Sequence, residues 1–359
     1  MISTAVPTDK HLNCCMMAAC HCDEHVEVGM PDEVLSANQL KTLVRHVVAA
    51  QGNGFIKDLL RECDSRIGVT KENFIANLEA AIDEGKLTQA RLEAWLAEVE
   101  GWGDQFVYVL EPPAVKPGAV AGLLANSPVA GLIGAPPSLD FPDDLELKLV
   151  KHDDTGLSLL WHQRKEGWNR WPARDFQEQQ DLDRVRFDAY RQRLDRSAVR
   201  FEWQYGAPYC ALMIQRSADI DHPAVFEFIQ AMFADVLSSN EPLKRIMLMA
   251  ALRNSAKNAG SVQSTRYEMA SGYVELGSLL PGSGIGAVEP VRVVLQSVDV
   301  DQFDRAKGYL NFASKEHGTS RNFSVEVFGD EAKLRIWAQC KREDVVTMLN
   351  LIMELNKTP

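Results

Sequence analysis

Basic and aromatic side chains are concentrated between residues 161 and 203. Residues 162–200 contain ten Lys and Arg residues, nine of them arginine, and Trp161, Trp168, Trp171 and Trp203 lie among or beside them. Guanidinium groups bind phosphates as a fork, and aromatic rings stack on bases. The segment therefore predicts a surface for nucleic acid or an acidic partner. Its candidate residues are Arg164, Lys165, Trp168, Arg170, Trp171 and Arg174.

The same segment is also compatible with a structural role. It contains seven Asp and Glu residues, including Asp181, Asp183, Asp188 and Asp195. On a helix, these carboxylates would pair with arginines three or four positions away and form a solvated ion-pair face. The tryptophans would then belong to the hydrophobic core. Both interpretations stay open at the level of the sequence.

A second chemically rich stretch lies near the N-terminus, where four of the seven cysteines fall within residues 14–22. Thiolates and imidazoles are zinc ligands, and the best four candidates are Cys14, Cys20, Cys22 and His25. Their spacing matches no common zinc finger. We therefore expect residues 1–30 to be a disordered leader, or sequence upstream of a true start at Met30, and we expect no cofactor.

Asp219, Asp221 and His222 are the one further group that could hold a divalent metal. They support the alternative function, a metal-dependent nuclease or other hydrolase whose site is assembled from scattered residues. Pro223 follows directly, and acidic or imidazole side chains before a proline are typical of a helix start. The sequence therefore assigns no catalytic residue, and an enzyme is the less expected class.

Composition limits the remaining possibilities. The chain has 359 residues, of which 46% are hydrophobic and 25% charged, so it is expected to fold, as two domains. A net charge of −12 excludes a uniformly basic nucleic-acid coat. No uninterrupted apolar run reaches the ~18 residues of a membrane span. The isolated Cys63, Cys210 and Cys340 are expected to be reduced thiols, which indicates a cytoplasmic protein.

Residues 31–111 predict a small four-helix bundle. Apolar residues recur at helical spacing in four stretches, and Ser36, Thr70 and Thr88 precede three of them as expected caps. Residues 106–110 predict a strand that leaves the bundle. The bundle has eight basic against fourteen acidic residues over 31–112, which favours a protein partner, as in death-fold domains. A bundle followed by an α+β domain also resembles the element order of the centromere protein N family, without a shared motif.

The rest of the chain predicts a linker and a larger α+β domain. Prolines punctuate residues 112–142 and predict no regular helix or strand there, although apolar residues indicate that part of the linker docks on a surface. Residues 143–359 predict an antiparallel sheet built of two strand-helix-strand-strand-helix units, with ferredoxin-like or TATA-binding-protein-like topology. The first helices of the two units are expected at 182–194 and 303–312, and a further helix is expected after Asn240.

These patterns together predict a cytoplasmic, non-catalytic adaptor or accessory subunit of a larger assembly. The helical bundle would bind a protein, and the Arg/Trp-rich face would bind DNA, RNA or an acidic partner. No membrane association is expected.

Overall fold

The computed structural model describes residues 35–48, 51–135, 140–180, 183–216, 220–257, 262–269, 272–277, 289–290, 293 and 305–357. All of them belong to one compact unit, Leu35–Pro359. The predicted leader with Cys14, Cys20, Cys22 and His25 lies outside the described residues, as do Met30 and Asp219. Within the described segments, none of the helices is both long and apolar enough to cross a lipid bilayer.

Helices appear in all four predicted stretches near the start of the described chain. They are α1 (Ala37–Leu43), continued by the π-helix η1 (Val44–Val48), α2 (Asn53–Glu62), α3 (Lys71–Asp83) and α4 (Gln89–Val99). The hydroxyls of Ser36, Thr70 and Thr88 accept hydrogen bonds from backbone N–H groups in the first turns of α1, α3 and α4, as predicted. We call α1–α4 the helical cluster, because their buried side chains share one hydrophobic core.

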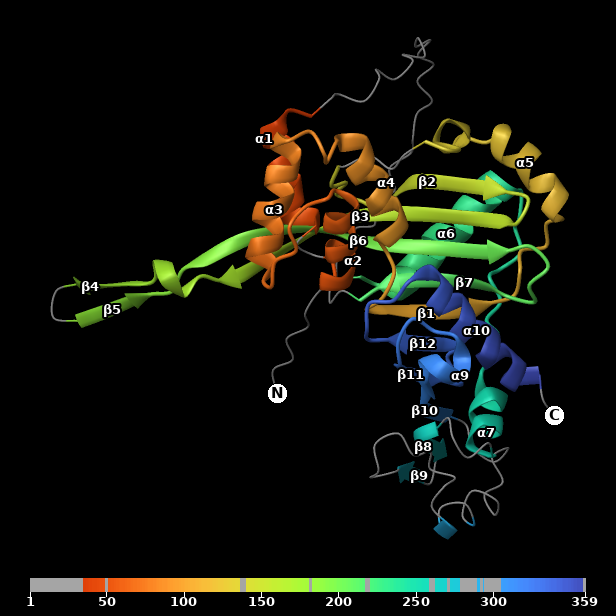
Figure 1. The fold of residues 1–359 in the computed structure, drawn as a ribbon. Coiled ribbons are helices and arrows are strands. Elements are labelled where there is room, and N and C mark those ends of the chain that lie inside the picture. Colours follow the sequence, from red (N-terminus) through yellow and green to blue (C-terminus); the bar gives the residue numbers. More distant parts are fainter. Residues whose placement is uncertain are drawn as a thin grey trace, which may run out of the picture. The chain divides into compact units, whose positions relative to one another are not determined.

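Ten strands of the described chain form one antiparallel sheet in the order β2-β3-β6-β7-β1-β12-β11-β10-β8-β9 (Figure 1). The N-terminal half consists of β2 (Glu146–Asp153), β3 (Gly156–Arg170), β6 (Tyr190–Gln204), β7 (Cys210–Gln215) and β1 (Gln105–Leu110). The other half consists of β12 (Lys333–Ile336), β11 (Phe323–Phe328), β10 (Arg305–Phe312), β8 (Val262–Met269) and β9 (Gly272–Gly277). The predicted α+β class is therefore confirmed.

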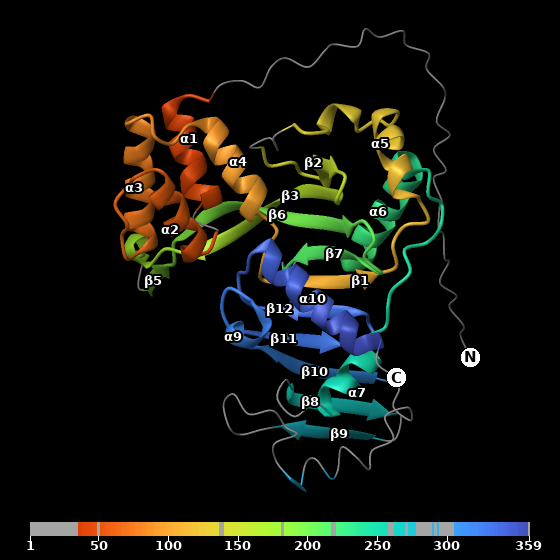
Figure 2. The same cartoon turned by 45° about the vertical axis from the view of Figure 1, so that its right-hand side comes forward.

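Helices cover the two faces of this sheet in different places (Figures 1 and 2). Tyr108 and Phe201 face a core shared with α5 (Pro117–Ala125) and α6 (His222–Leu237). Val107 and Met213 point the opposite way, because side chains alternate along a strand. They face a core shared with α7 (Met249–Lys257) and α10 (Arg342–Lys357).

Part of the proline-rich stretch is packed, as its apolar residues indicated. The expectation that the prolines exclude a regular element is wrong here: residues 117–125 form α5, because Pro117 occupies the first turn, where a proline is tolerated. Val120 and Leu124 are fully buried in the core with α6. The short η2 (Ala130–Leu132) follows, and Gly134 N–H donates to the Val150 carbonyl of the edge strand β2. The division of the chain at 112–142 stays a prediction.

Two predicted helices are wrong, and a third is shorter than expected. Residues 183–187 form strand β5 and 190–204 form β6, so the helix expected over 182–194 is absent from the described part of this stretch. Residues 305–312 form β10, where a helix was expected over 303–312. The helix expected after Asn240 starts only at Met249. In the first two cases pairing with a neighbouring strand outweighs a weak helical periodicity, and the two predicted strand-helix-strand-strand-helix units lose their first helix.

Candidate functional site

The Arg/Trp-rich segment forms a two-stranded β-ribbon. Strands β3 and β6 pair continuously from Gly156–Gln204 to Arg170–Tyr190, whereas their outer neighbours β2 and β7 pair with them only as far as His162 and Val199. Beyond that point the ribbon continues through η3 (Pro172–Arg174) into β4 (Phe176–Gln180) and β5 (Asp183–Phe187), which pair with each other. Figure 1 shows this ribbon leaving the sheet beside the helical cluster. We call residues 163–197 the ribbon.

Large aromatic side chains on the ribbon are exposed to solvent. Trp168 is 65% exposed, Tyr190 54%, Phe176 53% and Trp171 40%. Trp161, on the part of β3 that lies inside the sheet, is completely buried. Exposed aromatic side chains gathered in one place are typical of interaction surfaces rather than of a packed core.

The predicted basic residues of the ribbon differ in their partners. Arg164 forms ion pairs with Asp143, at 2.9 Å, and with Glu166. Arg170 is paired with Asp175 and Asp188. The guanidinium of Arg174 lies 5.2 Å from the centre of the Trp171 ring. Lys165 and Arg174 have no ion-pair partner among the described residues. The structure thus places all six predicted residues on one ribbon. Of their four cations, Arg164 and Arg170 are in ion pairs, whereas Lys165 and Arg174 have no such partner among the described residues.

Asp175 lies at the joint of the ribbon, where the inner part formed by β3 and β6 meets the outer part formed by β4 and β5. Its carboxylate accepts hydrogen bonds from both terminal nitrogens of Arg170 and from the Ala189 N–H, and it lies 3.4 Å from Arg186 Nη2. The hydrogen bonds from Arg170 are the main reason that the pKa of Asp175 falls far below its usual range. The joint is therefore held by charge and hydrogen bonding rather than by burial.

A buried ion cluster anchors the base of the ribbon to the helical cluster. The carboxylate of Glu100, at the end of α4, accepts two hydrogen bonds from Arg196, at 2.8 and 2.7 Å. His162 Nε2 lies 3.2 Å from Glu100 Oε2. Burial raises the pKa of Glu100, but Arg196 and His162 outweigh burial and lower it to about 2. Burial lowers the pKa of His162, so its imidazole is neutral at pH 7.

Arg200 forms a second buried anchor on the same face of β6. Its Nη2 donates to the carbonyls of Ala97 and Glu100, at 3.1 and 2.9 Å, and its Nη1 donates to Ser158 Oγ at 3.1 Å. The guanidinium also lies 5.0 Å from the centre of the Trp102 ring. Arg196 and Arg200 therefore have a structural role, although the sequence analysis grouped them with the other basic residues of the Arg/Trp-rich segment.

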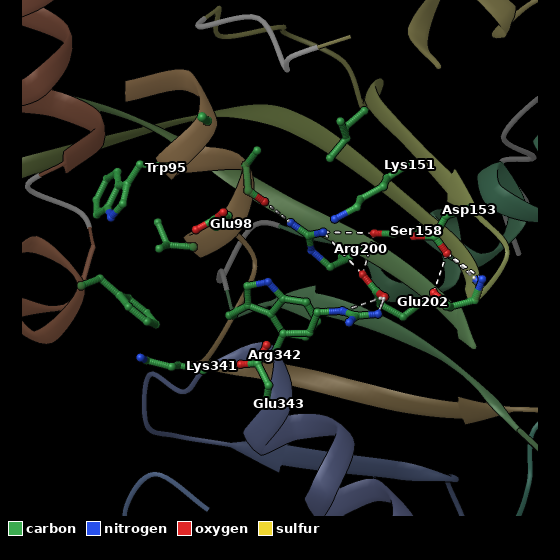
Figure 3. A pocket seen from close by; sticks show the side chains of 18 of the residues that line it. Trp95, Glu98, Lys151, Asp153, Ser158, Arg200, Glu202, Lys341, Arg342 and Glu343 are labelled. Atoms are coloured by element: carbon green, nitrogen blue, oxygen red, sulfur yellow. Dashed lines mark hydrogen bonds and ion pairs between the residues drawn. The ribbon is translucent and has the colours of Figure 1, made fainter. Parts of the chain in front are cut away.

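A pocket of about 820 Å³ lies between α4, the sheet and the start of α10 (Figure 3). Arg200, Ser158, Glu202 and Arg342 form a hydrogen-bonded row along it, in which Arg342 Nη2 donates to Glu202 Oε2 at 3.0 Å. The charged groups of this row are paired with one another, which is typical of a structural network. We assign no reaction to the pocket.

Two of the candidate nuclease ligands, Asp221 and His222, lie at the start of α6. Asp221 is the residue that precedes α6, and His222 begins this helix. The His222 Nδ1 atom is 2.7 Å from the Tyr108 hydroxyl, and the ring packs edge-on against Phe106. Within the described residues, no group of three or more His, Cys, Asp or Glu side chains is arranged to hold a metal ion.

The sequence reasoning missed Glu100 as the partner of the ribbon base. One signal was present: Glu100 is the C-terminal cap of α4, where a negative charge is unfavourable to the helix dipole. A carboxylate in such a position needs a compensating cation from elsewhere. The sequence alone does not reveal that the cation is Arg196, which is remote along the chain.

In comparisons with known proteins, no family model matches the chain, and no curated protein sequence matches it.

Proposed function

We propose that this protein is a non-catalytic adaptor of a larger assembly and that the ribbon is its nucleic-acid-binding arm. One observation carries the proposal: exposed aromatic rings and arginines share a two-stranded ribbon whose strands, beyond the sheet, pair with each other. Aromatic rings supply stacking surfaces for bases, and arginine and lysine supply contacts to phosphates.

The charges of the ribbon support this proposal more than the net charge of the chain does. The ribbon has nine basic and seven acidic residues, whereas the whole chain carries −12. Lys165, Arg174 and Arg184 have no ion-pair partner within the described part of the chain. Arg164 and Arg186 are in exposed pairs. Because exposed pairs contribute only ~0–1 kcal/mol, a phosphate can replace the carboxylate at little cost.

The helical cluster is proposed as the protein-binding part of the same adaptor. It is acidic, and two apolar side chains between α2 and α3 are exposed, Ile67 at 39% and Val69 at 86%. Apolar side chains rimmed by charges are typical of protein interfaces. A cytoplasmic location is proposed because Cys63, Cys210 and Cys340 are free, buried thiols.

The test is salt-dependent binding of fluorescent DNA and RNA oligonucleotides, followed by anisotropy. Replacing Lys165, Arg174 and Arg184 together by Ala removes three cations for which the described part of the chain supplies no ion-pair partner. We expect affinity to fall and the slope of log K against log salt to shrink by about two to three. The matched control replaces the exposed Arg66, Lys116 and Lys315, which are not part of the ribbon, and should leave the slope unchanged.

A wild-type protein that shows no salt-dependent binding to any oligonucleotide would overturn the nucleic-acid proposal. An acidic protein would then be the better candidate for the ribbon. Equal losses in the ribbon variant and in the control would also contradict it, because the effect would then come from net charge alone.

A further inference from the structure

The outer part of the ribbon separates its side chains into two chemically different faces. In the register of β4 and β5, Gln177 pairs with Arg186 and Gln179 pairs with Arg184. Side chains directly opposite each other in an antiparallel pair lie on the same face, and residues two apart on one strand also share a face. One face therefore combines Gln177, Gln179, Arg184 and Arg186.

The other face of the same two strands holds the apolar and acidic residues. Phe176 pairs with Phe187, and their rings stack with centres 4.6 Å apart. Glu178 pairs with Val185, and Asp183 lies on the same face two residues along β5. The carboxylates of β4 and β5 are thus kept away from the glutamine and arginine face. At the inner end of that face, Asp175 and Asp188 contact Arg186.

Glutamine and arginine are the side chains that read base edges in DNA. A glutamine amide matches N6 and N7 of adenine, and an arginine fork matches O6 and N7 of guanine. The described side chains of this face, Gln177, Gln179, Arg184 and Arg186, are all exposed. This face therefore places two glutamines, which are suited to adenine, beside two arginines, which are suited to guanine.

The dimensions of the ribbon favour double-stranded DNA as its ligand. Two strands ~4.8 Å apart, with their side chains, fit the major groove of B-DNA, which is ~12 Å wide and admits a two-stranded ribbon. The major groove of double-stranded RNA is too narrow for side chains to read. At ~3.3 Å per residue, the part of β3 from Arg164 to Arg170 and the strand β4 rise by about 23 and 16 Å, and together they are comparable with the ~34 Å of one DNA turn.

We infer that the face formed by Gln177, Gln179, Arg184 and Arg186 reads base edges in the major groove of double-stranded DNA. This inference rests on the proposed function, since it requires that the ribbon bind nucleic acid. It goes beyond that function because it names the duplex, the groove and the residues that give sequence preference. Lys165 and Arg174, which are nearer the base, contact the DNA backbone.

The experiment uses the full-length protein and a library of duplexes with a random 20-base-pair core, from which bound molecules are selected and sequenced. We expect enrichment of a short motif that contains guanine and adenine. Arg184→Ala should relax the preference at one guanine by about 5- to 150-fold, and Gln177→Ala should do the same at one adenine. Replacing that guanine by 7-deazaguanine, which lacks N7, should reproduce the loss seen with Arg184→Ala.

The matched control is Val185→Ala, which lies next to Arg184 on β5 but on the opposite face. It should leave the selected motif unchanged. Binding to duplexes with the expected salt dependence but without sequence preference would overturn this inference and leave the proposed function standing. Preference for single strands, or for double-stranded RNA, would also overturn it. Absence of all nucleic-acid binding would overturn both.

Discussion

The inner and outer halves of the hairpin formed by β3 and β6 contain the same residue types, tryptophan and arginine, in opposite environments. Inside the sheet, Trp161 is completely buried and Arg200 is held by hydrogen bonds to the end of α4. Beyond the sheet, Trp168 is exposed and Arg164 makes only surface ion pairs. The difference arises because the inner half has β2, β7 and the helical cluster beside it. An arginine or tryptophan thus takes its role from its neighbours, and four predictions test this contrast.

Truncation of the two tryptophans of β3 should give the largest contrast. We expect Trp161→Ala to lower the free energy of unfolding by about 3–5 kcal/mol, because it empties a fully buried site. Trp168→Ala should change it by no more than about 0.5 kcal/mol. Urea denaturation followed by circular dichroism measures both. A large loss from Trp168→Ala would mean that the ribbon packs on another part of the protein.

Breaking the buried ion cluster should have the next largest effect. We expect Glu100→Gln to cost about 3 kcal/mol of unfolding free energy, because it leaves the buried guanidinium of Arg196 without a counter-charge. The matched control is Glu98→Gln, an exposed position on α4, which should change stability by about 0.5 kcal/mol or less. Equal stability of the two variants would contradict a structural role for the cluster.

Acid should weaken the same cluster in wild type. The pKa of Glu100 is lowered to about 2 in the folded chain, so its contribution is complete above the ordinary value of 4.5 and is lost as the pH falls towards 2. His162 acts in the same direction, because burial lowers its pKa and the unfolded chain takes up its proton first. Unfolding free energies measured between pH 7 and pH 3 should decline, and they should decline less in Glu100→Gln. Parallel pH profiles of the two proteins would argue against this assignment.

The smallest effect is expected for a single outer arginine. Arg164→Ala should cost only ~0–1 kcal/mol, because its pairs with Asp143 and Glu166 are exposed to solvent. Raising the salt concentration should make even this difference disappear. A loss comparable to that of Glu100→Gln would show that the outer half of the hairpin is structural as well.

Local patterns in the sequence predicted the elements that depend on local contacts. The caps Ser36, Thr70 and Thr88 and the apolar repeats of α3 and α4 were sufficient, because capping and helical periodicity act within a few residues. The helix expected over 182–194 was wrong. Its residues Val185 and Phe187 have cross-strand partners in Glu178 and Phe176, and such pairing depends on a register that no short window contains.

The candidate site was predicted in part. Composition identified the segment, and the structure places Arg164, Lys165, Trp168, Arg170, Trp171 and Arg174 together on the ribbon. Composition did not separate exposed from buried arginines, because the partner of Arg196 is Glu100, far away along the chain. It also did not reveal the face with Gln177 and Arg186, because the two strands had been expected to be partly a helix.

Strand β1 has a consequence for how the chain reaches this fold during synthesis. It follows α4 directly, yet Gln105 pairs with Gln215 on one side and with Ile336 on the other. The strand that joins the two halves of the sheet is therefore made early and completed only when the last strand, β12, emerges from the ribosome. Contacts this distant along the chain slow folding, and an unpaired strand edge is a site of aggregation until it is covered. Co-translational folding thus leaves one edge of β1 open until nearly the whole chain has been made.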